Sequence, residues 1–196
     1  MPLEEGDEIS YYLMKKQAEK PAYYTVYEDE NIILMNKRPG VLVHEDDEGR
    51  DNTLIMHIKA YLYQKGEYAP ESEQSFAPAL CNRIDRNTGG IVIAAKNAEA
   101  LRVMNDKIKN NEISKFYLCA VHGRLPRKSD TLTAYLKKNS ATNTVAISDK
   151  ERDGYKNIIT KYRVVDSNGW AALCEVELIT GRTHQIRVQF SSRKTP

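Results

Sequence analysis

The chain has 196 residues and a formal net charge of +2, with 41% hydrophobic and 29% charged residues. This length suits one domain, or one domain with a fragment of another, and the apolar content is sufficient for a folded core. No run of about 18 uncharged apolar residues is present, so no membrane span is expected. Three cysteines without paired spacing and four scattered histidines predict neither a disulfide framework nor a His-rich metal site, and they favour a cytoplasmic setting.

The small net charge conceals an uneven distribution along the chain. Residues 1–80 hold 16 acidic and 8 basic side chains, whereas residues 81–196 hold 11 acidic and 21 basic ones. A basic half of this kind is typical of polyanion-binding proteins, because lysines and arginines that contact phosphates release condensed counterions. A solvated surface on which the acidic half faces the basic half explains the same numbers, so charge alone leaves nucleic-acid binding open.

The first part of the chain predicts short strands and one helix. Residues 1–20 are expected to form a short strand and a linker. Further strands are predicted at residues 24–27, 32–37 and 41–44, separated by a turn at 28–31 and by Arg38-Pro39-Gly40. Asp51-Asn52-Thr53 is a capping sequence for a helix whose apolar residues share one face: Leu54, Ile55, Ile58 and Leu62. Residues 66–78 are predicted to be a polar loop.

The second part is more regularly patterned. A buried strand at 91–95 precedes a helix that Asn97 caps and that carries Leu101, Met104 and Ile108 at helical spacing. Residues 115–123 alternate as a strand, with Phe116, Leu118 and Ala120 on one face and Tyr117, Cys119 and Val121 on the other. Strands at 162–166 and 170–178 flank Ser167-Asn168-Gly169, a hairpin signal, and a turn at 180–183 leads into a helix at 184–191. Many strands with few helices predict an α+β domain with a mixed, mostly antiparallel sheet.

The segment from Asn82 to Gly90 is the first with chemical potential. If residues 82–85 are extended, Arg83 and Asp85 project from the same face. A carboxylate among arginines stays ionised, which suits an anionic nucleophile as well as a structural ion pair. Spacing alone favours the ion pair, because such networks commonly perturb carboxylates without any catalytic role.

The second such segment runs from Gly181 to Arg187. Its helix start offers free N–H groups to an anion, and Arg182 and Arg187 supply guanidinium groups that suit phosphate or carboxylate. A surface helix with its basic face in water fits the same residues, and spacing does not separate the two interpretations.

Three segments in order resemble the motifs of one family. They are 83–90 (Arg-Ile-Asp-Arg-Asn-Thr-Gly-Gly), 115–123 (Lys-Phe-Tyr-Leu-Cys-Ala-Val-His-Gly) and 178–187 (Leu-Ile-Thr-Gly-Arg-Thr-His-Gln-Ile-Arg). Together with residues 39–44 they are similar to the RluA-type RNA pseudouridine synthases, which isomerise uridine to pseudouridine in ribosomal or transfer RNA. The resemblance covers about residues 22–196 and implies the pseudouridine synthase fold.

The resemblance implies a role for particular residues. Asp85 matches the catalytic aspartate, Tyr117 the tyrosine that packs against the target base, and Arg187 the basic residue that pairs with the aspartate. Arg83 matches the arginine that fills the gap left by the flipped base, and with it Arg86, Arg182 and His184 are the expected RNA-binding residues.

The family uses no metal or organic cofactor, so none is expected here, and the expected partner is structured RNA bound by a monomer without membrane contact. Two positions depart from the family pattern: Asn82 stands where the family usually has His, and Gly89 where it often has Ser.

The two ends of the chain suggest a fragment of a longer synthase. Residues 1–20 resemble the last strand of a small S4-type RNA-binding domain followed by a linker, and residues 21–196 the catalytic domain. Arg193-Lys194-Thr195-Pro196 stops where the family usually continues into a further segment, so the catalytic domain is expected to be truncated at its C-terminus.

Two other functions remain open at this point. The same fold could serve as a catalytically silent RNA-binding module, which the presence of Asp85, Tyr117 and Arg187 together disfavours. A uridine-specific glycosylase would release free uracil, but hydrolysis of a glycosidic bond normally needs two carboxyl groups, and no second acid lies near Asp85 in sequence. Which RNA and which uridine are involved does not follow from the sequence.

Overall fold

The computed structural model describes residues 21–44, 52–72, 76–139 and 144–196. The strand and linker predicted within residues 1–20 therefore lie outside the described residues. The chain divides into two compact units, Met1–Asn110 (unit 1) and Asn111–Pro196 (unit 2), each with its own sheet. The predicted boundary at residue 20 stays a prediction.

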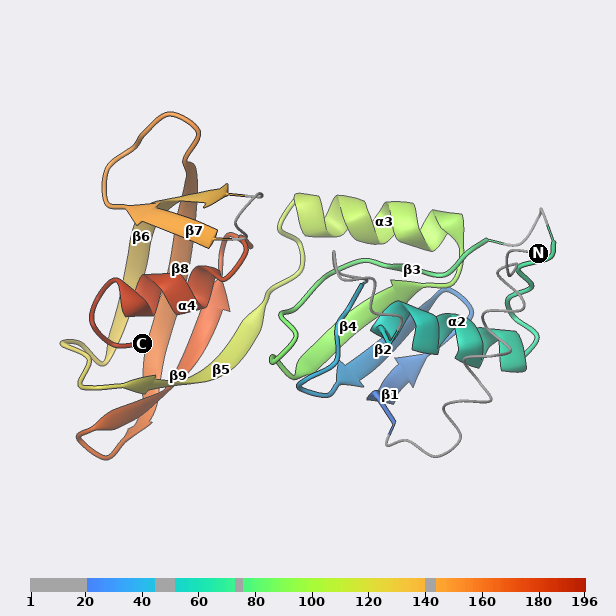
Figure 1. Cartoon of the computed structure of the whole chain (residues 1–196), viewed down its shortest axis with the longest axis horizontal. Coiled ribbons are helices and arrows are strands. Elements are labelled where there is room, and N and C mark those ends of the chain that lie inside the picture. The colour runs from blue at the N-terminus through green and yellow to red at the C-terminus, as the bar shows by residue number, and fades with distance from the viewer. Residues whose placement is uncertain (1–20, 45–51, 73–75, 140–143) are drawn as a thin grey trace. The chain divides into compact units, whose positions relative to one another are not determined.

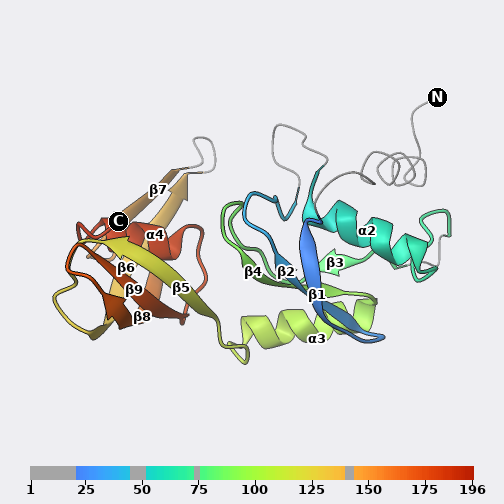
Figure 2. The same cartoon turned by 90° about the horizontal axis from the view of Figure 1, so that it is seen from below.

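Unit 1 contains a four-stranded sheet in the order β1-β2-β4-β3 (Figure 1). Its elements are β1 (Tyr23–Glu28), β2 (Ile32–Lys37), α2 (Leu54–Gln64), β3 (Ala79–Leu80), β4 (Gly90–Ala95) and α3 (Ala98–Lys109). Figure 2 shows α2 and α3 on opposite sides of this sheet. The main core lies on the α2 side, where apolar side chains of β2, β4 and α2 are buried together: Ile33, Met35, Val92, Ala94, Leu54, Ile58 and Leu62.

The two helices of unit 1 begin in different ways. Asn97 caps α3 as predicted, because its side chain accepts a hydrogen bond from the Ala100 amide at 2.8 Å. Thr53 precedes α2 without a side-chain capping bond; instead the first amides of α2 donate to the carbonyls of Leu42 (2.7 Å) and Val43 (3.3 Å). Backbone carbonyls thus replace the capping side chain that the sequence predicted.

The strand predicted at residues 41–44 is wrong. Leu42 makes only an isolated parallel bridge, to Thr53. The physical reason is that the chain turns at Gly40 (φ +91°), whose amide donates to the Arg86 carbonyl, so the residues after it do not continue β2. Their carbonyls serve the start of α2 instead.

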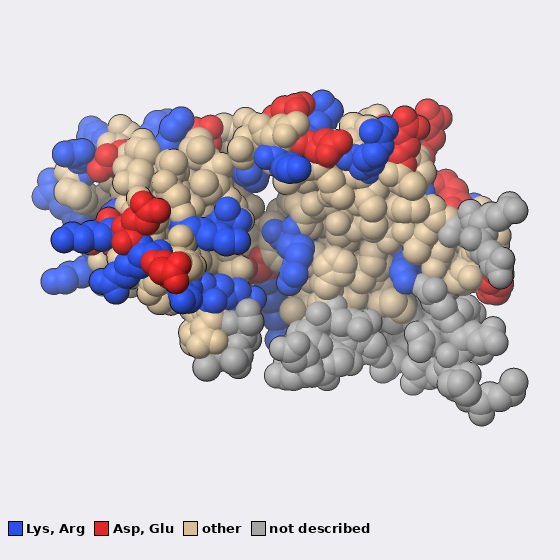
Figure 3. Space-filling view, turned by 90° about the horizontal axis from the view of Figure 1, so that it is seen from above, with Lys and Arg blue, Asp and Glu red and all other residues tan. Residues whose placement is uncertain are grey.

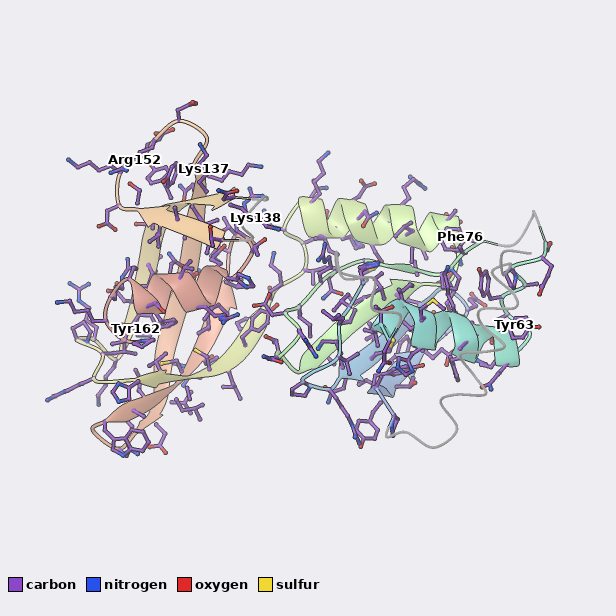
Figure 4. The ribbon with its side chains drawn as sticks, viewed as in Figure 1. Tyr63, Phe76, Lys137, Lys138, Arg152 and Tyr162 are labelled. Atoms are coloured by element: carbon purple, nitrogen blue, oxygen red, sulfur yellow. The ribbon has the colours of Figure 1, made fainter. Side chains whose placement is uncertain are left out.

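Unit 2 is a five-stranded sheet in the order β5-β9-β8-β6-β7. Its elements are β5 (Phe116–His122), β6 (Ser129–Asn139), β7 (Thr144–Ser148), β8 (Lys156–Ser167), β9 (Ala171–Leu178) and α4 (Gln185–Ser191). Helix α4 covers one face, where Phe190 meets Tyr162 edge-on with ring centroids 5.5 Å apart (Figure 4). On β5 the alternation is as predicted: Val121 is buried on the α4 side, whereas Phe116 and Leu118 are 61% and 69% exposed.

The predicted α+β fold class is confirmed. Every pairing between named strands in the described residues is antiparallel, and three helices accompany the two sheets. In the described part of the chain no helix is long and apolar enough to cross a membrane.

Candidate functional site

The segment that carries Asp85 connects β3 to β4 in unit 1. Residues 82–85 have no regular secondary structure, but Asn82 fixes the segment to β4. Its side-chain oxygen accepts from the Ile93 amide at 2.8 Å and its amide group donates to the Ile91 carbonyl at 3.2 Å. Asn82, the position that departs from the family pattern, therefore extends the pairing of β3 beyond its last residue.

A turn follows directly, closed by the Thr88 amide, which donates to the Asp85 carbonyl at 3.0 Å. The carbonyl of Arg86 within this turn accepts two hydrogen bonds, from the Gly40 amide at 2.8 Å and from Lys37 Nζ at 3.0 Å. The Arg86 side chain donates in return to the Gly40 carbonyl at 3.1 Å. The backbone next to Asp85 is thus held by the segment that follows β2.

Lys37 is the buried centre of this arrangement. The residue is fully buried, and besides the Arg86 carbonyl its ammonium donates to the carbonyls of Val41 (2.8 Å) and Arg38 (3.0 Å). Burial lowers the pKa of Lys37 to about 8, while the nearby negative charge of Asp85 acts in the opposite direction. A cation therefore lies close to the predicted catalytic carboxylate, on the side of the protein core.

The two glycines after Asp85 have separate reasons for being glycine. At Gly89 a Cβ atom would come within 3.2 Å of the Pro39 ring, so a residue with a side chain would press against Pro39. Gly90 has φ +132°, a backbone conformation that residues with a side chain rarely adopt. Gly89 therefore permits close packing against Pro39, and Gly90 permits the backbone angle with which the chain passes from the Asp85 turn into β4.

In unit 2 the predicted residues lie on β5 and at the start of α4. Tyr117 is half-buried on β5, opposite Val176 of β9, and packs against the core beneath α4. Arg182 and Arg187 are exposed, and His184 immediately precedes α4 with φ +54°, in the left-handed region.

A buried glutamine, Gln185, organises the turn that presents these residues. Its side-chain oxygen accepts from the Thr180 hydroxyl (2.9 Å) and from the Arg182 amide (3.1 Å). Its amide group donates to the Ile159 carbonyl (3.1 Å) and to the Thr160 hydroxyl (2.8 Å), both on β8. Sequence reasoning overlooked Gln185 and Lys37. The signal for Lys37 was its place on β2 in phase with the buried Ile33 and Met35, whereas Gln185 shares its face of α4 with the buried Gln189 and gave no signal of its own.

The structure thus groups the predicted residues within each unit. Arg83, Asp85 and Arg86 share one short connection of unit 1, with Arg83 and Arg86 exposed and Asp85 half-buried, and the other predicted residues belong to unit 2. The predicted pairing of Asp85 with Arg187 involves both units and stays a prediction.

The net charge is positive in unit 2 and negative in unit 1. Residues 111–196 hold 15 basic and 8 acidic side chains, whereas residues 1–110 hold 14 basic and 19 acidic ones. Lys and Arg side chains are prominent over unit 2 in Figure 3. Within the described ranges no three His, Cys, Asp or Glu side chains come together as metal ligands.

A family model described as RNA pseudouridylate synthase matches residues 31–192, which include parts of both units. The chain belongs to the RNA pseudouridylate synthase family. It is 30% identical over 171 residues to an RNA pseudouridine synthase of Mycoplasma pneumoniae that is described as uncharacterized, and 29% identical over 175 residues to ribosomal large subunit pseudouridine synthase D of Borreliella burgdorferi. Both alignments cover 87% of this chain but only 52% and 51% of the relatives, so the chain spans about half their length.

Solved structures of pseudouridylate synthases share the fold. Human RNA pseudouridylate synthase domain containing 4 superposes with a TM-score of 0.70 at 19% identity, covering 88% of this chain and 65% of that protein. The pseudouridine synthase fold expected from the sequence motifs is thereby confirmed.

Proposed function

We propose that this chain catalyses the isomerisation of uridine to pseudouridine in structured ribosomal or transfer RNA, with Asp85 as the catalytic carboxylate. The observation that carries the proposal is the family match over residues 31–192, which contains Asp85, Tyr117 and Arg187 in the order of the family motifs. A cytoplasmic location and a monomeric state are part of the same proposal.

The reaction breaks the bond between N1 of uracil and C1′ of ribose, turns the detached base, and joins C5 to C1′. The proton on C5 is then lost to solvent. Asp85 either attacks C1′ as a nucleophile or removes a proton from the ribose, and both routes need an ionised carboxylate. The Lys37 ammonium lies close enough to Asp85 for the two charges to interact.

The target uridine must leave its stack to reach Asp85, at a cost of about a few kcal/mol. In the proposal Tyr117 packs against the extruded base, Arg83 takes the place that the base vacates, and Arg187 pairs with Asp85. Arg86, Arg182 and His184 contact the RNA. The turn that carries Asp85 suits this function, because its backbone is hydrogen-bonded to residues 37–40 and does not have to reorganise during the reaction.

Primer extension on carbodiimide-treated RNA tests the proposal directly. The purified chain is incubated with ribosomal and transfer RNA that lack pseudouridine, and the expected result is a new stop at one or a few uridines. Free uracil in the supernatant would indicate a glycosylase instead. RNA binding with neither product would indicate a silent binding module, and either result would reject the proposal.

A further inference from the structure

An exposed tryptophan marks one end of unit 2. Trp170 is 66% exposed at the hairpin between β8 and β9, and it is the only tryptophan of the chain. Its carbonyl accepts from the Gly123 amide at 2.6 Å, and its ring lies 6.3 Å from the ring of His122. The hairpin therefore lies directly beside the end of β5 and the loop that follows it.

Basic residues of two segments that are distant in sequence lie near this hairpin. Arg124, Arg127 and Lys128 follow β5, Lys194 follows α4, and all four are exposed. Arg193 is not part of this group, because its guanidinium donates to the Gln189 carbonyl at 3.1 Å and reaches toward Thr133 of β6. The segments meet because the His122 amide donates to the Pro196 carbonyl at 2.7 Å. Figures 1 and 2 show the loop, the hairpin and the C-terminus at the same end of unit 2. We name Trp170 and these four basic residues the Trp170 surface.

The acidic groups close to the Trp170 surface are fewer than the basic ones. Asp130 lies 3.4 Å from Arg127, and Asp166 is exposed before the hairpin. Glu175 is already paired with Arg163 at 3.1 Å. The surface keeps a positive excess in which two of the four basic side chains are arginines, the residue that binds phosphate through two parallel hydrogen bonds.

The backbone of the Trp170 surface is held in place before any ligand arrives. The Lys128 carbonyl accepts from the Val164 amide at 2.7 Å, and the Arg127 carbonyl from the Tyr162 hydroxyl at 3.2 Å. On the other segment, the Thr195 amide donates to the Phe190 carbonyl at 3.1 Å. A surface that is already ordered loses little conformational entropy on binding.

We infer that the Trp170 surface is a second RNA-docking site, in which the indole of Trp170 stacks on an unpaired base while the surrounding arginines and lysines contact phosphates on either side of it. An exposed aromatic ring among basic side chains is the combination with which proteins hold single-stranded nucleic acid, since every base offers a face for stacking. The inference rests on the proposed function for its substrate, RNA. It adds a contact region for nucleotides outside the target uridine.

The site lies apart from the predicted uridine site. Tyr117 is near the start of β5 and His122 is at its end, five residues further along an extended strand. At about 3.4 Å per residue the two ends are about 17 Å apart. One RNA molecule can therefore contact both places through different nucleotides.

Fluorescence of the single tryptophan provides the test. A stem-loop RNA with one looped uridine is titrated into the full chain, and we expect quenching of Trp170 emission as the base stacks on it. Inorganic polyphosphate carries charge but no bases, so it should compete with the RNA and leave the emission unquenched. Trp170→Ala should weaken RNA binding about 5- to 100-fold, and Trp170→Phe should restore most of the affinity.

A charge variant and its control complete the experiment. Arg124→Ala, Arg127→Ala and Lys128→Ala combined should weaken binding more than about tenfold and lower the salt dependence of log K by about 2. The control removes three exposed basic residues of α3 in the acidic unit 1, by Arg102→Ala, Lys107→Ala and Lys109→Ala combined. It loses the same formal charge and should bind RNA nearly as the wild type does.

The outcomes separate this inference from the proposed function. Unquenched Trp170 emission at saturating RNA, or equal affinities of the two triple variants, would overturn the second docking site even if pseudouridine forms. Quenching with the expected loss of affinity but without any pseudouridine would uphold the docking site and reject the proposed function. Melting curves confirm that every variant is folded.

Discussion

Replacing Lys37 by methionine tests how the turn that carries Asp85 is held. The change keeps a long unbranched side chain but removes three hydrogen bonds to backbone carbonyls. The Arg86 carbonyl retains the Gly40 amide, whereas the carbonyls of Arg38 and Val41 lose the Lys37 ammonium. A buried carbonyl without a donor costs about 1–3 kcal/mol, and methionine regains part of this through apolar burial, so we expect a loss of about 2–4 kcal/mol in the free energy of unfolding.

Urea unfolding followed by circular dichroism measures this loss, and hydrogen exchange of β2 and β4 amides assigns it to unit 1. Lys109→Met, an exposed position at the end of α3, is the matched control and should change stability by less than about 1 kcal/mol. Turnover well below the unfolding transition should fall far less than in Asp85→Asn, because the bond between Gly40 and Arg86 still holds the turn. A Lys37→Met protein as stable as the control would refute the reasoning.

The lowered pKa of Lys37 adds a pH dependence to the same comparison. Burial brings the folded-state pKa down to about 8, despite the opposing effect of Asp85, from an ordinary value of 10.5. Between these values the unfolded chain holds a proton that the folded chain has released, so the stability contributed by this residue rises with pH across the window. The stability difference between wild type and Lys37→Met should therefore grow from about pH 8 to about pH 10.

Three further predictions concern stability and binding. Burial opposes ionisation of Glu28, but hydrogen bonds from Lys65, Tyr61 and Lys96 outweigh it and lower the pKa to about 2 from 4.5. The free energy of unfolding of the wild type, measured with urea, should therefore fall as the pH is lowered through this range, and Glu28→Gln should lose less stability over the same range. An equal loss in both proteins would count against the hydrogen bonds of Glu28 as the cause. Gln185→Leu should destabilise unit 2 by about 2–4 kcal/mol and speed hydrogen exchange in the turn before α4, because four hydrogen bonds are lost. RNA binding should weaken steeply with salt, log K falling by about 0.7–0.9 per neutralised phosphate for each tenfold rise in salt; flat affinity would show that basic charge does not contact the RNA.

Local signals predicted much of the fold. Asn97 before apolar residues at helical spacing predicted α3, and Ser167-Asn168-Gly169 predicted the hairpin, where the Asn168 side chain accepts from the Ala171 amide at 2.9 Å. Strict alternation along β5 predicted which side chains share a face, but not which face is buried, because both faces carry apolar residues. Each of these signals involves residues close in sequence, whose geometry is fixed by backbone rules alone.

Features that depend on distant residues could not be predicted in this way. Lys37 is buried because its ammonium reaches the Arg86 carbonyl, 49 residues further along, and nothing near Lys37 in sequence indicates that partner. Strands β6 and β7 went unpredicted, although Leu132, Ala134 and Leu136 alternate as buried residues on β6. Their neighbours are mostly Thr, Lys and Asn, so the apolar signal is weak until β8 and α4 supply the other side of the core.

The candidate site also contains residues that the sequence predicted and residues that it did not. Asp85, Tyr117 and Arg187 were identified through motifs, and the family match supports the activity but not the role of any single residue. Gln185, whose four hydrogen bonds organise the second motif, carries no charge and offers no reactive group. Residues that position others are recognised by their bonds, which only the folded chain reveals.

Tritium release from RNA labelled at C5 of uridine, compared between wild type and Asp85→Asn, tests the central claim most directly. The substitution keeps the side-chain volume and removes the negative charge and the reactive oxygen, so isomerisation should fall to background whether Asp85 acts as nucleophile or as base. RNA binding should persist or tighten slightly, because a negative charge facing a polyanion has gone. An Asp85→Asn protein that releases tritium at a tenth of the wild-type rate or faster would contradict the assignment of Asp85 as the catalytic carboxylate.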